Sequence, residues 1–232
     1  MDSVLVMPNL IDQVHTRMVD AIAEGVLAPG ERLAQEQVAE RLNVSRQPVS
    51  HALQLLKRQG LAVEHGRRGL SVAPFDPNRM RDLYQLRAVI DGLACRLAAE
   101  RVAHGEAPAL EIDGLRERLS AGNLSTEAPI HDWIAADVAF HQSIYLLSGN
   151  VALAETVSER WPHFKRCMGT SLSTPTVRAG IWAEHAAIAD AILSGAARAA
   201  ESAATHHAER AGCALYQRLN EEAAVQASAR RA

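Results

Sequence analysis

Apolar residues recur at helical spacing in two short segments between residues 33 and 60, separated by Asn43-Val44. Residues three and four apart share one face of a helix, so each segment predicts a short helix with one buried side. Ser45 precedes the second helix as a candidate N-cap that accepts a hydrogen bond from a free amide, and Gly60 follows it as a candidate C-cap. The expected core positions are Val38, Ala39 and Leu42 in the first helix and Val49, Ala52, Leu53 and Leu56 in the second.

Two short strands are expected after the second helix. Residues 61–65 and 70–73 have strand character, and His65-Gly66-Arg67-Arg68-Gly69 joins them as a flexible hairpin tip. A helix, a turn, a second helix and a basic hairpin in this order predict a winged helix-turn-helix. The tip places Arg67 where it could enter a minor groove of DNA.

The polar side of the second helix has the chemistry of a DNA reader. Arg46, Gln47 and Ser50 are expected to point away from the core, and Arg and Gln can bond base edges in the major groove. The chain carries a net charge of −3, but residues 41–72 contain six Lys or Arg against Glu64 alone, a local balance of +5. A merely solvated basic face would explain this charge but not its coincidence with the helix and the hairpin.

From Met80 onward every segment predicts helix, because Ala and Leu are abundant and alternation of β-branched or aromatic residues is nearly absent. Gly, Pro and Ser clusters divide this part into about six helices. The expected fold is mainly α, a winged helix-turn-helix followed by an all-helical bundle. The expected divisions are a DNA-binding domain over residues 1–74, a linker over 75–79, a helical domain over 80–221 and a disordered tail over 222–232.

Composition fits a protein of the cytoplasm. At 232 residues and 48% hydrophobic content, the chain can bury a core in each of two domains. The three cysteines are odd in number and far apart, which predicts reduced thiols rather than a disulfide framework. No apolar run approaches the ~18 residues of a membrane span, so no membrane partner is expected.

Four polar residues of the bundle could share one place. Asp137 and His141 stand one helical turn apart on one face, where they could hold a cation or form a hydrogen-bonded core pair. His185 and His207 lie on either side of Gly195. If the chain reverses at this glycine, the two helical arms return both rings to one level.

Three segments of the first domain carry a family resemblance. They are Gly25-Val26-Leu27-Ala28-Pro29-Gly30-Glu31-Arg32-Leu33, Val44-Ser45-Arg46-Gln47-Pro48-Val49 and Ala52-Leu53-Gln54-Leu55-Leu56. Over about residues 10–74 they resemble the N-terminal domain of GntR-type bacterial transcription regulators. The resemblance implies contacts with operator DNA at Arg32, Ser45, Arg46, Gln47, His65 and Gly66. Where the family pattern usually has Arg after Pro-Val, this chain has Ser50 and His51, so one contact is expected to be lost or replaced.

The second domain, with Leu83-Tyr84-Gln85-Leu86-Arg87 near its start, resembles the FCD effector-binding domain of the FadR branch of that family. The resemblance implies that a divalent metal is held by Asp137, His141, His185 and His207. Three imidazoles and one carboxylate suit Zn²⁺, with Ni²⁺ or Mn²⁺ as alternatives. A small carboxylic acid would bring its carboxylate to the metal, and Arg87 is the candidate cation beside it. Alternatively, Arg87 pairs with Asp91 at i+4.

Two classes of function are compatible with these features, and a third hypothesis differs only in the role of the metal. A ligand-responsive regulator would be a homodimer on a roughly palindromic operator, acting as a repressor whose DNA affinity changes with the effector. A metal-dependent hydrolase or lyase with a DNA-binding appendage is the alternative, although no separate Glu or His stands out as its general base. In the third reading the metal is structural. The regulator is favoured because it uses both halves of the chain.

Overall fold

The computed structural model describes residues 10–66, 69–172 and 174–229, with side chains up to Val225 at the C-terminal end. The chain forms two compact units. The first, here called the winged unit, comprises the residues up to Phe75 together with 162–166, and the remainder forms the helical unit. No helix in the described part of the chain combines the length and the apolar character that a membrane span requires.

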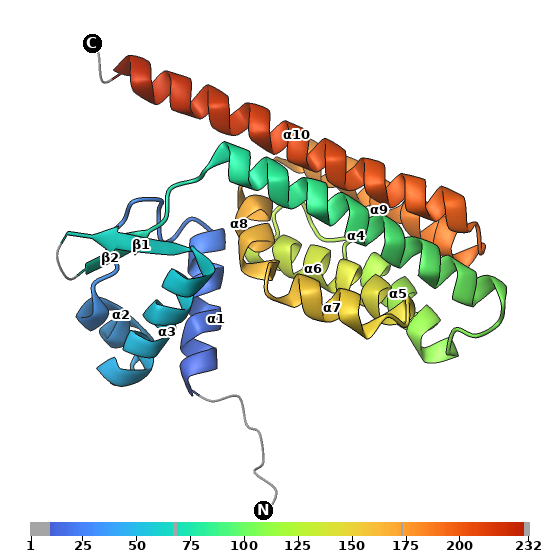
Figure 1. Ribbon diagram of the computed structural model, residues 1–232, viewed down its shortest axis with the longest axis horizontal. Coiled ribbons are helices and arrows are strands. Elements are labelled where there is room, and N and C mark those ends of the chain that lie inside the picture. Colours follow the sequence, from blue (N-terminus) through green and yellow to red (C-terminus); the bar gives the residue numbers. More distant parts are fainter. Residues whose placement is uncertain (1–9, 67–68, 173, 230–232) are drawn as a thin grey trace, which may run out of the picture. The chain divides into compact units, whose positions relative to one another are not determined.

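The winged unit has the predicted order of helix, turn, helix and hairpin (Figure 1). Asn43 adopts the left-handed conformation at φ 51° and ends the first helix of the motif, while Gly60 at φ 77° caps the second, as the sequence predicts. The strands pair antiparallel, with Ala62 opposite Val72 and His65 opposite Gly69. The elements are α1 Leu10–Ala23, α2 Gln35–Leu42, α3 Arg46–Gln59, β1 Ala62–His65 and β2 Gly69–Val72.

The core of the winged unit lies between α1, α3 and the hairpin. The predicted inner face of α3 is buried, and Val49, Ala52 and Leu56 have no exposed surface. They belong to one apolar cluster with Met18 and Ile22 of α1. Complete burial of a large apolar side chain contributes about 1.5 to 3 kcal/mol, so this cluster is sufficient to fix the orientation of α3.

Residues 31–33 extend the hairpin at the edge of β2. The Leu33 N–H donates to the Leu70 carbonyl at 2.8 Å, and the Val72 N–H donates to the Glu31 carbonyl at 2.9 Å. Arg32 lies between these two bonds, opposite Ser71, and its side chain is exposed. Backbone pairing therefore holds Arg32 beside the wing.

The helical unit contains the described helices α4 to α10, except for residues 162–166 of α8, and no described strand. The sequence indicated about six helices, and the difference is a break between Ser158 and Trp161, where no glycine marks the turn. Pro162 lies in the first turn of the following helix, a position that proline favours. The helices are α4 Pro77–Ala103, α5 Ala109–Ser120, α6 Ile130–Leu147, α7 Val151–Ser158, α8 Trp161–Ser171, α9 Pro175–Leu193 and α10 Ala197–Ala229.

The longest helix, α10, runs side by side with α4 (Figure 1). Gly212 makes this close approach feasible, because a Cβ at this position would lie 2.5 Å from the Cβ of Tyr84. The chain reverses into α10 at Gly195, whose φ is +70°. The reversal that the sequence suggested for this glycine is confirmed, and α9 and α10 form a helical hairpin.

Two expected boundaries differ from the structure. Helix α4 begins at Pro77 rather than at Met80, because the Asp76 side chain accepts hydrogen bonds from two free amides of the first turn at 3.0 and 3.2 Å. The tail expected to be disordered from residue 222 is helical as far as Ala229. Its alanine content favours helix, and Arg218 pairs with Glu222 one turn later at 3.0 Å.

Candidate functional site

The outer face of α3 carries the polar side chains that the sequence predicted to read DNA. Arg46 and Gln47 are exposed and Ser50 is half-buried, all opposite the buried face of Val49 and Leu53. The helical period that fixes the core therefore also fixes which side chains face solvent.

Ser45 occupies the N-cap position of α3, but its side chain makes no capping hydrogen bond. The prediction that its hydroxyl accepts from the helix was wrong in this respect. A different bond reaches the first turn, because the Gln35 side-chain amide of α2 donates to the Arg46 carbonyl at 2.7 Å. The Ser45 hydroxyl is exposed at a helix N-terminus, where backbone N–H groups attract a phosphate.

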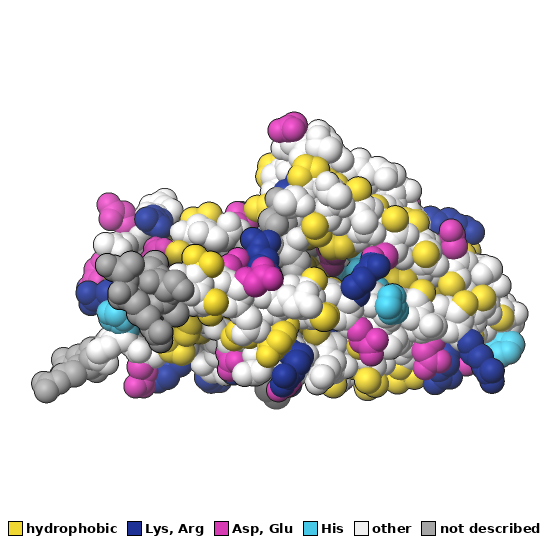
Figure 2. All heavy atoms as spheres, turned by 90° about the horizontal axis from the view of Figure 1, so that it is seen from above, with side chains coloured by type: hydrophobic (Ala, Val, Ile, Leu, Met, Phe, Trp, Pro, Cys, Tyr) yellow, Lys and Arg dark blue, Asp and Glu magenta, His cyan; other side chains and the backbone are white. Residues whose placement is uncertain are grey.

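Arg46 has a partner that the sequence did not indicate. Its guanidinium lies 2.9 Å from the Glu36 carboxylate of α2, and the two side chains are 64% and 66% exposed. Figure 2 likewise shows acidic and basic side chains interspersed on the face that it draws. An exposed ion pair of this kind is worth about 0 to 1 kcal/mol, so contact of Arg46 with a base would require only a weak bond to open.

A polar groove of about 370 Å³ lies between α3 and the wing within the winged unit. It brings together Arg32, Arg46 and Ser50, three of the residues predicted to touch DNA. His65 and Gly66 stand at the exposed end of β1, and Gly66 has a φ of +64°. Arg67 lies outside the described residues.

The helical unit brings three histidines together from three helices. His141 of α6, His185 of α9 and His207 of α10 offer ring nitrogens that all lie within 4.8 Å of one another. The three side chains are buried, whereas the neighbouring His206 is exposed. The inward orientation of position 207 follows the alanine-rich face that surrounds it on α10.

Asp137 lies beside two of the three histidines. Its Oδ1 is 3.6 Å from His141 Nε2 and its Oδ2 is 3.8 Å from His185 Nε2. Both separations exceed hydrogen-bond distance, so the alternative of a hydrogen-bonded core pair is not what the structure contains. Asp137 Oδ1, His141 Nε2 and both ring nitrogens of His185 are buried with no hydrogen-bond partner among the described residues. Buried polar atoms without partners are costly, and these are the atoms that bind metal ions.

Carboxylates lie behind two of the rings, and one of the two is hydrogen-bonded to its ring. His207 Nδ1–H donates to Glu184 Oε2 at 2.6 Å, and His141 Nδ1 lies 3.5 Å from Asp91 Oδ2. Each contact leaves the Nε2 of its ring available. A carboxylate behind a metal-ligating histidine fixes the tautomer and raises the basicity of the ring. Neither carboxylate was predicted from the sequence to take part in the site, although Glu184 directly precedes His185.

The protonation states favour neutral ligands. Burial, followed by the positive charge of Arg87, lowers the pKa of His141 and of His207, and burial also lowers the pKa of His185. Burial raises the pKa of Asp137 above its ordinary value. Neutral imidazoles are the form that binds metals, and a buried carboxylate gains from a nearby cation.

Arg87 was expected to contact the effector or to pair with Asp91, and in the structure it pairs with Asp91 of the same helix. Its Nε donates to Asp91 Oδ2 at 3.1 Å, and both side chains are buried. The hydroxyl of Tyr145 donates to the other oxygen of Asp91. Burial alone would lower the pKa of Arg87, but Asp91 and nearby groups raise it above the usual value, so the guanidinium remains charged. Asp91 thus links Arg87 to His141.

Comparisons with known proteins match both units to described protein families. The sequence pattern of the FCD domain matches residues 82–210, and that of bacterial regulatory proteins of the gntR family matches residues 10–72. The "Nta operon transcriptional regulator" of Aminobacter aminovorans is 33% identical over 129 residues, which are 56% of this chain and 59% of that protein, less than two thirds of its length. The "Probable D-xylose utilization operon transcriptional repressor" of Paenarthrobacter nicotinovorans is 26% identical over 229 residues, 95% of each chain.

Among solved structures, E. coli McbR/YncC has the same fold, with a TM-score of 0.77 at 20% identity over 91% of this chain and 99% of that one. The two sequence relatives are transcription regulators by name, which argues against a hydrolase or lyase. The FCD match covers more than half of the 232 residues, and the gntR match covers the winged unit. The chain therefore belongs to the GntR family of bacterial regulatory proteins and is a DNA-binding transcription regulator with an FCD domain.

Proposed function

We propose that this regulator binds a divalent metal ion and a small organic acid in its helical unit, and that the acid alters its affinity for operator DNA. The observation that carries the proposal is the set of buried, partnerless ligand atoms at the meeting point of three helices. Zn²⁺ is the favoured ion, with Ni²⁺ or Mn²⁺ as alternatives, because imidazole donors suit these metals. The proposed ligands are Asp137, His141, His185 and His207.

The charge of the site favours an acidic effector. A divalent ion held by Asp137 and three neutral histidines leaves one net positive charge, which would attract a carboxylate. The charged neighbours do not change this balance, because Arg87 is paired with Asp91 and Arg210 with Glu184. Arg87 binds Asp91 through its Nε, so a contact with the acid would come from the terminal nitrogens of its buried guanidinium.

On the DNA side, we propose that a homodimer presents two winged units to a roughly palindromic operator. Arg32, Arg46, Gln47 and Ser50 would face the major groove, Ser45 a phosphate, and His65, Gly66 and Arg67 the adjacent groove or backbone. A repressor role is favoured by the name of the Paenarthrobacter relative. Cytoplasmic location remains the expectation for such a protein.

The test is an operator-binding titration with the purified full chain, metal-loaded and metal-stripped, with and without a panel of small carboxylic acids. We expect at least one acid to change the operator affinity only when metal is present. His185→Ala should lose both the bound metal and the response, whereas His206→Ala should keep both, because position 206 is exposed on the same hairpin.

Two results would contradict the proposal. Equal metal content in the wild type and in the His185→Ala variant would refute the ligand assignment. Metal binding without any response of operator affinity to the acids would instead support a purely structural ion.

A further inference from the structure

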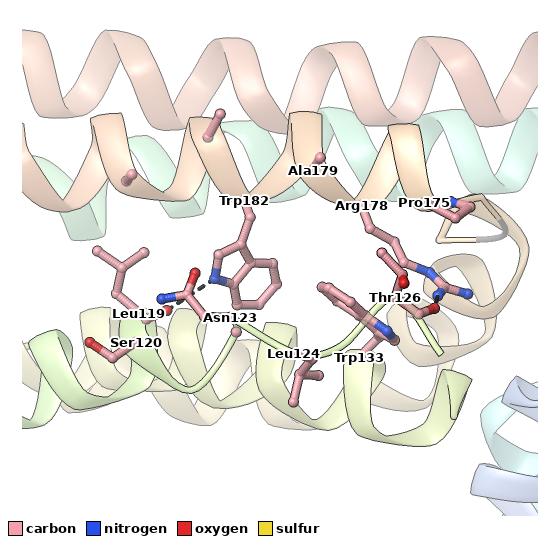
Figure 3. A pocket seen from close by; sticks show the side chains of 13 residues that line it. Leu119, Ser120, Asn123, Leu124, Thr126, Trp133, Pro175, Arg178, Ala179 and Trp182 are labelled. Atoms are coloured by element: carbon pink, nitrogen blue, oxygen red, sulfur yellow. Dashed lines mark hydrogen bonds between the residues drawn. The ribbon is translucent and has the colours of Figure 1, made fainter. Parts of the chain in front are cut away.

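The helical unit has a cavity that is lined by none of the proposed metal ligands. It is a pocket of about 530 Å³ between α9, the start of α6 and the loop that follows α5. We call it the tryptophan pocket, after Trp133 of α6 and Trp182 of α9, which project into the same space (Figure 3). Pockets for small molecules usually have volumes of roughly 300 to 1,000 Å³, so this one is large enough for one or two fused rings.

The aromatic walls of the pocket are fixed in place. The two indoles meet edge to face, with ring centroids 5.9 Å apart and an interplanar angle of 80°. Trp182 Nε1–H donates to the Leu119 carbonyl at 3.0 Å. Gly122 allows the loop to lie against this ring, because a Cβ there would be 1.5 Å from Trp182 Cε2. Rings held in this way can bind a flat apolar molecule with little loss of side-chain entropy.

Arg178 borders the pocket, and no ion pair joins it to an acidic side chain among the described residues. The Arg178 Nε donates to the Leu172 carbonyl at 2.7 Å, and its Nη1 donates to the Thr126 carbonyl at 3.2 Å. Its guanidinium carbon lies 5.3 Å from the centroid of the Trp133 ring. None of the 13 described residues that line the pocket is acidic, so the charge of Arg178 is opposed only by carbonyl dipoles.

The indole N–H of Trp133 is a second polar group at this wall. Trp133 is 5% exposed, and its Nε1–H has no hydrogen-bond partner among the described residues. A buried indole N–H normally finds an acceptor, and leaving it without one costs about 1 to 3 kcal/mol. This atom has almost no exposed surface, so an acceptor oxygen bound at Arg178 would reach it only after a small shift of the Trp133 side chain.

We propose that the tryptophan pocket binds a planar aromatic carboxylate. Its ring system would lie against the indoles, and its carboxylate would take the charge-assisted hydrogen bond from Arg178 and approach Trp133 Nε1–H. The site is distinct from the proposed metal centre, but Trp182 contacts both, since its ring centroid is 4.8 Å from that of His185. Trp182 is none of the proposed metal ligands, so the pocket can bind its ligand without the metal.

The test is calorimetric titration of the full-length protein with 2-naphthoate, in parallel with the neutral analogue 2-naphthalenemethanol. We expect one 2-naphthoate per chain, bound at least about tenfold more tightly than the alcohol, because a hydrogen bond to a charged group is lost with the alcohol. The same affinity is expected after the protein has been stripped of metal with a chelator. Failure here leaves the proposed metal centre untouched, since metal content is measured separately.

Variants identify the groups responsible. Arg178→Gln should weaken 2-naphthoate binding about tenfold, and Trp133→Phe, which keeps an aromatic ring but removes the N–H, about threefold. Arg116→Gln is the matched control, because Arg116 is an exposed arginine of α5 paired with Asp113 and outside the pocket.

Three results would overturn the proposal. They are equal affinity for the alcohol and the acid, wild-type affinity in both pocket variants, and loss of binding on removal of metal. The comparison of acid with alcohol uses the wild-type protein, so it decides the matter even if Arg178→Gln fails to fold. A dissociation constant for 2-naphthoate weaker than about 1 mM would equally overturn it.

Discussion

Replacement of Glu184 by Gln tests the metal centre through a residue that would not itself touch the ion. Glu184 Oε2 accepts a hydrogen bond of 2.6 Å from His207 Nδ1, which is within the short range of charge-assisted bonds. Glutamine has nearly the same size and can still accept this bond, but it lacks the negative charge. The variant therefore removes the electrostatic support of the His207 ring and leaves its packing intact.

The expected loss follows from the behaviour of such supporting carboxylates. Their removal typically lowers metal affinity about 10- to 100-fold, which corresponds to about 1.4 to 2.7 kcal/mol. Loss of the Arg210 partner adds little to this, because the Arg210 side chain is 54% exposed and remains hydrated.

The measurement is competition for Zn²⁺ between the protein and a chromophoric chelator. Glu221→Gln serves as the control, since it makes the same charge change at an exposed position of α10. We expect the control to bind zinc as the wild type does. Wild-type affinity in the Glu184→Gln variant would show that His207 does not bind the ion through a ring supported by this carboxylate.

Further predictions concern the DNA surface, packing and assembly. Arg46→Ala should weaken specific operator binding by about 1 to 3 kcal/mol in a titration at fixed salt, whereas Glu36→Gln, which frees Arg46, should strengthen binding by up to about fivefold. The opposite order of the two variants would contradict the placement of α3. Gly122→Ala should lower the free energy of unfolding in urea by about 1 to 3 kcal/mol, because its Cβ would overlap the Trp182 ring, while Gly114→Ala, with open space around it, should not destabilise. Sedimentation at micromolar concentration should give a dimer, and a monomer that also fails to dimerise on DNA would refute the proposed assembly.

The winged unit could be predicted from the sequence because its signals are local. The spacing of Val49, Ala52 and Leu56 fixes the buried face of α3, and Asn43 and Gly60 mark the helix ends by their left-handed conformations. The partner of Arg46 could not be predicted in this way. Its bond to Glu36 depends on how α2 and α3 pack, and sequence spacing within one helix carries no such information.

The proposed metal centre shows the same contrast: part of it follows from helix geometry and part only from how the helices pack. The hairpin at Gly195 allowed His185 and His207 to be placed at one level from helix geometry. The supporting roles of Glu184 and Asp91 arise only when α9 meets α10 and α4 meets α6. The helical end of α10 was missed for another reason, since its polar and alanine-rich sequence suits a solvated helix as well as a disordered tail.

The hairpin of α9 and α10 makes the proposed centre intolerant of changes in the length of α10 before His207. Inserting one residue between Ala197 and His207 would turn the ring of His207 by about 100° and move it about 1.5 Å along α10. Even a seven-residue insertion, which nearly restores the direction, would displace the ring by about 10 Å. In functional relatives of this chain, insertions and deletions should therefore fall outside this stretch of α10, in connections such as the one between α5 and α6.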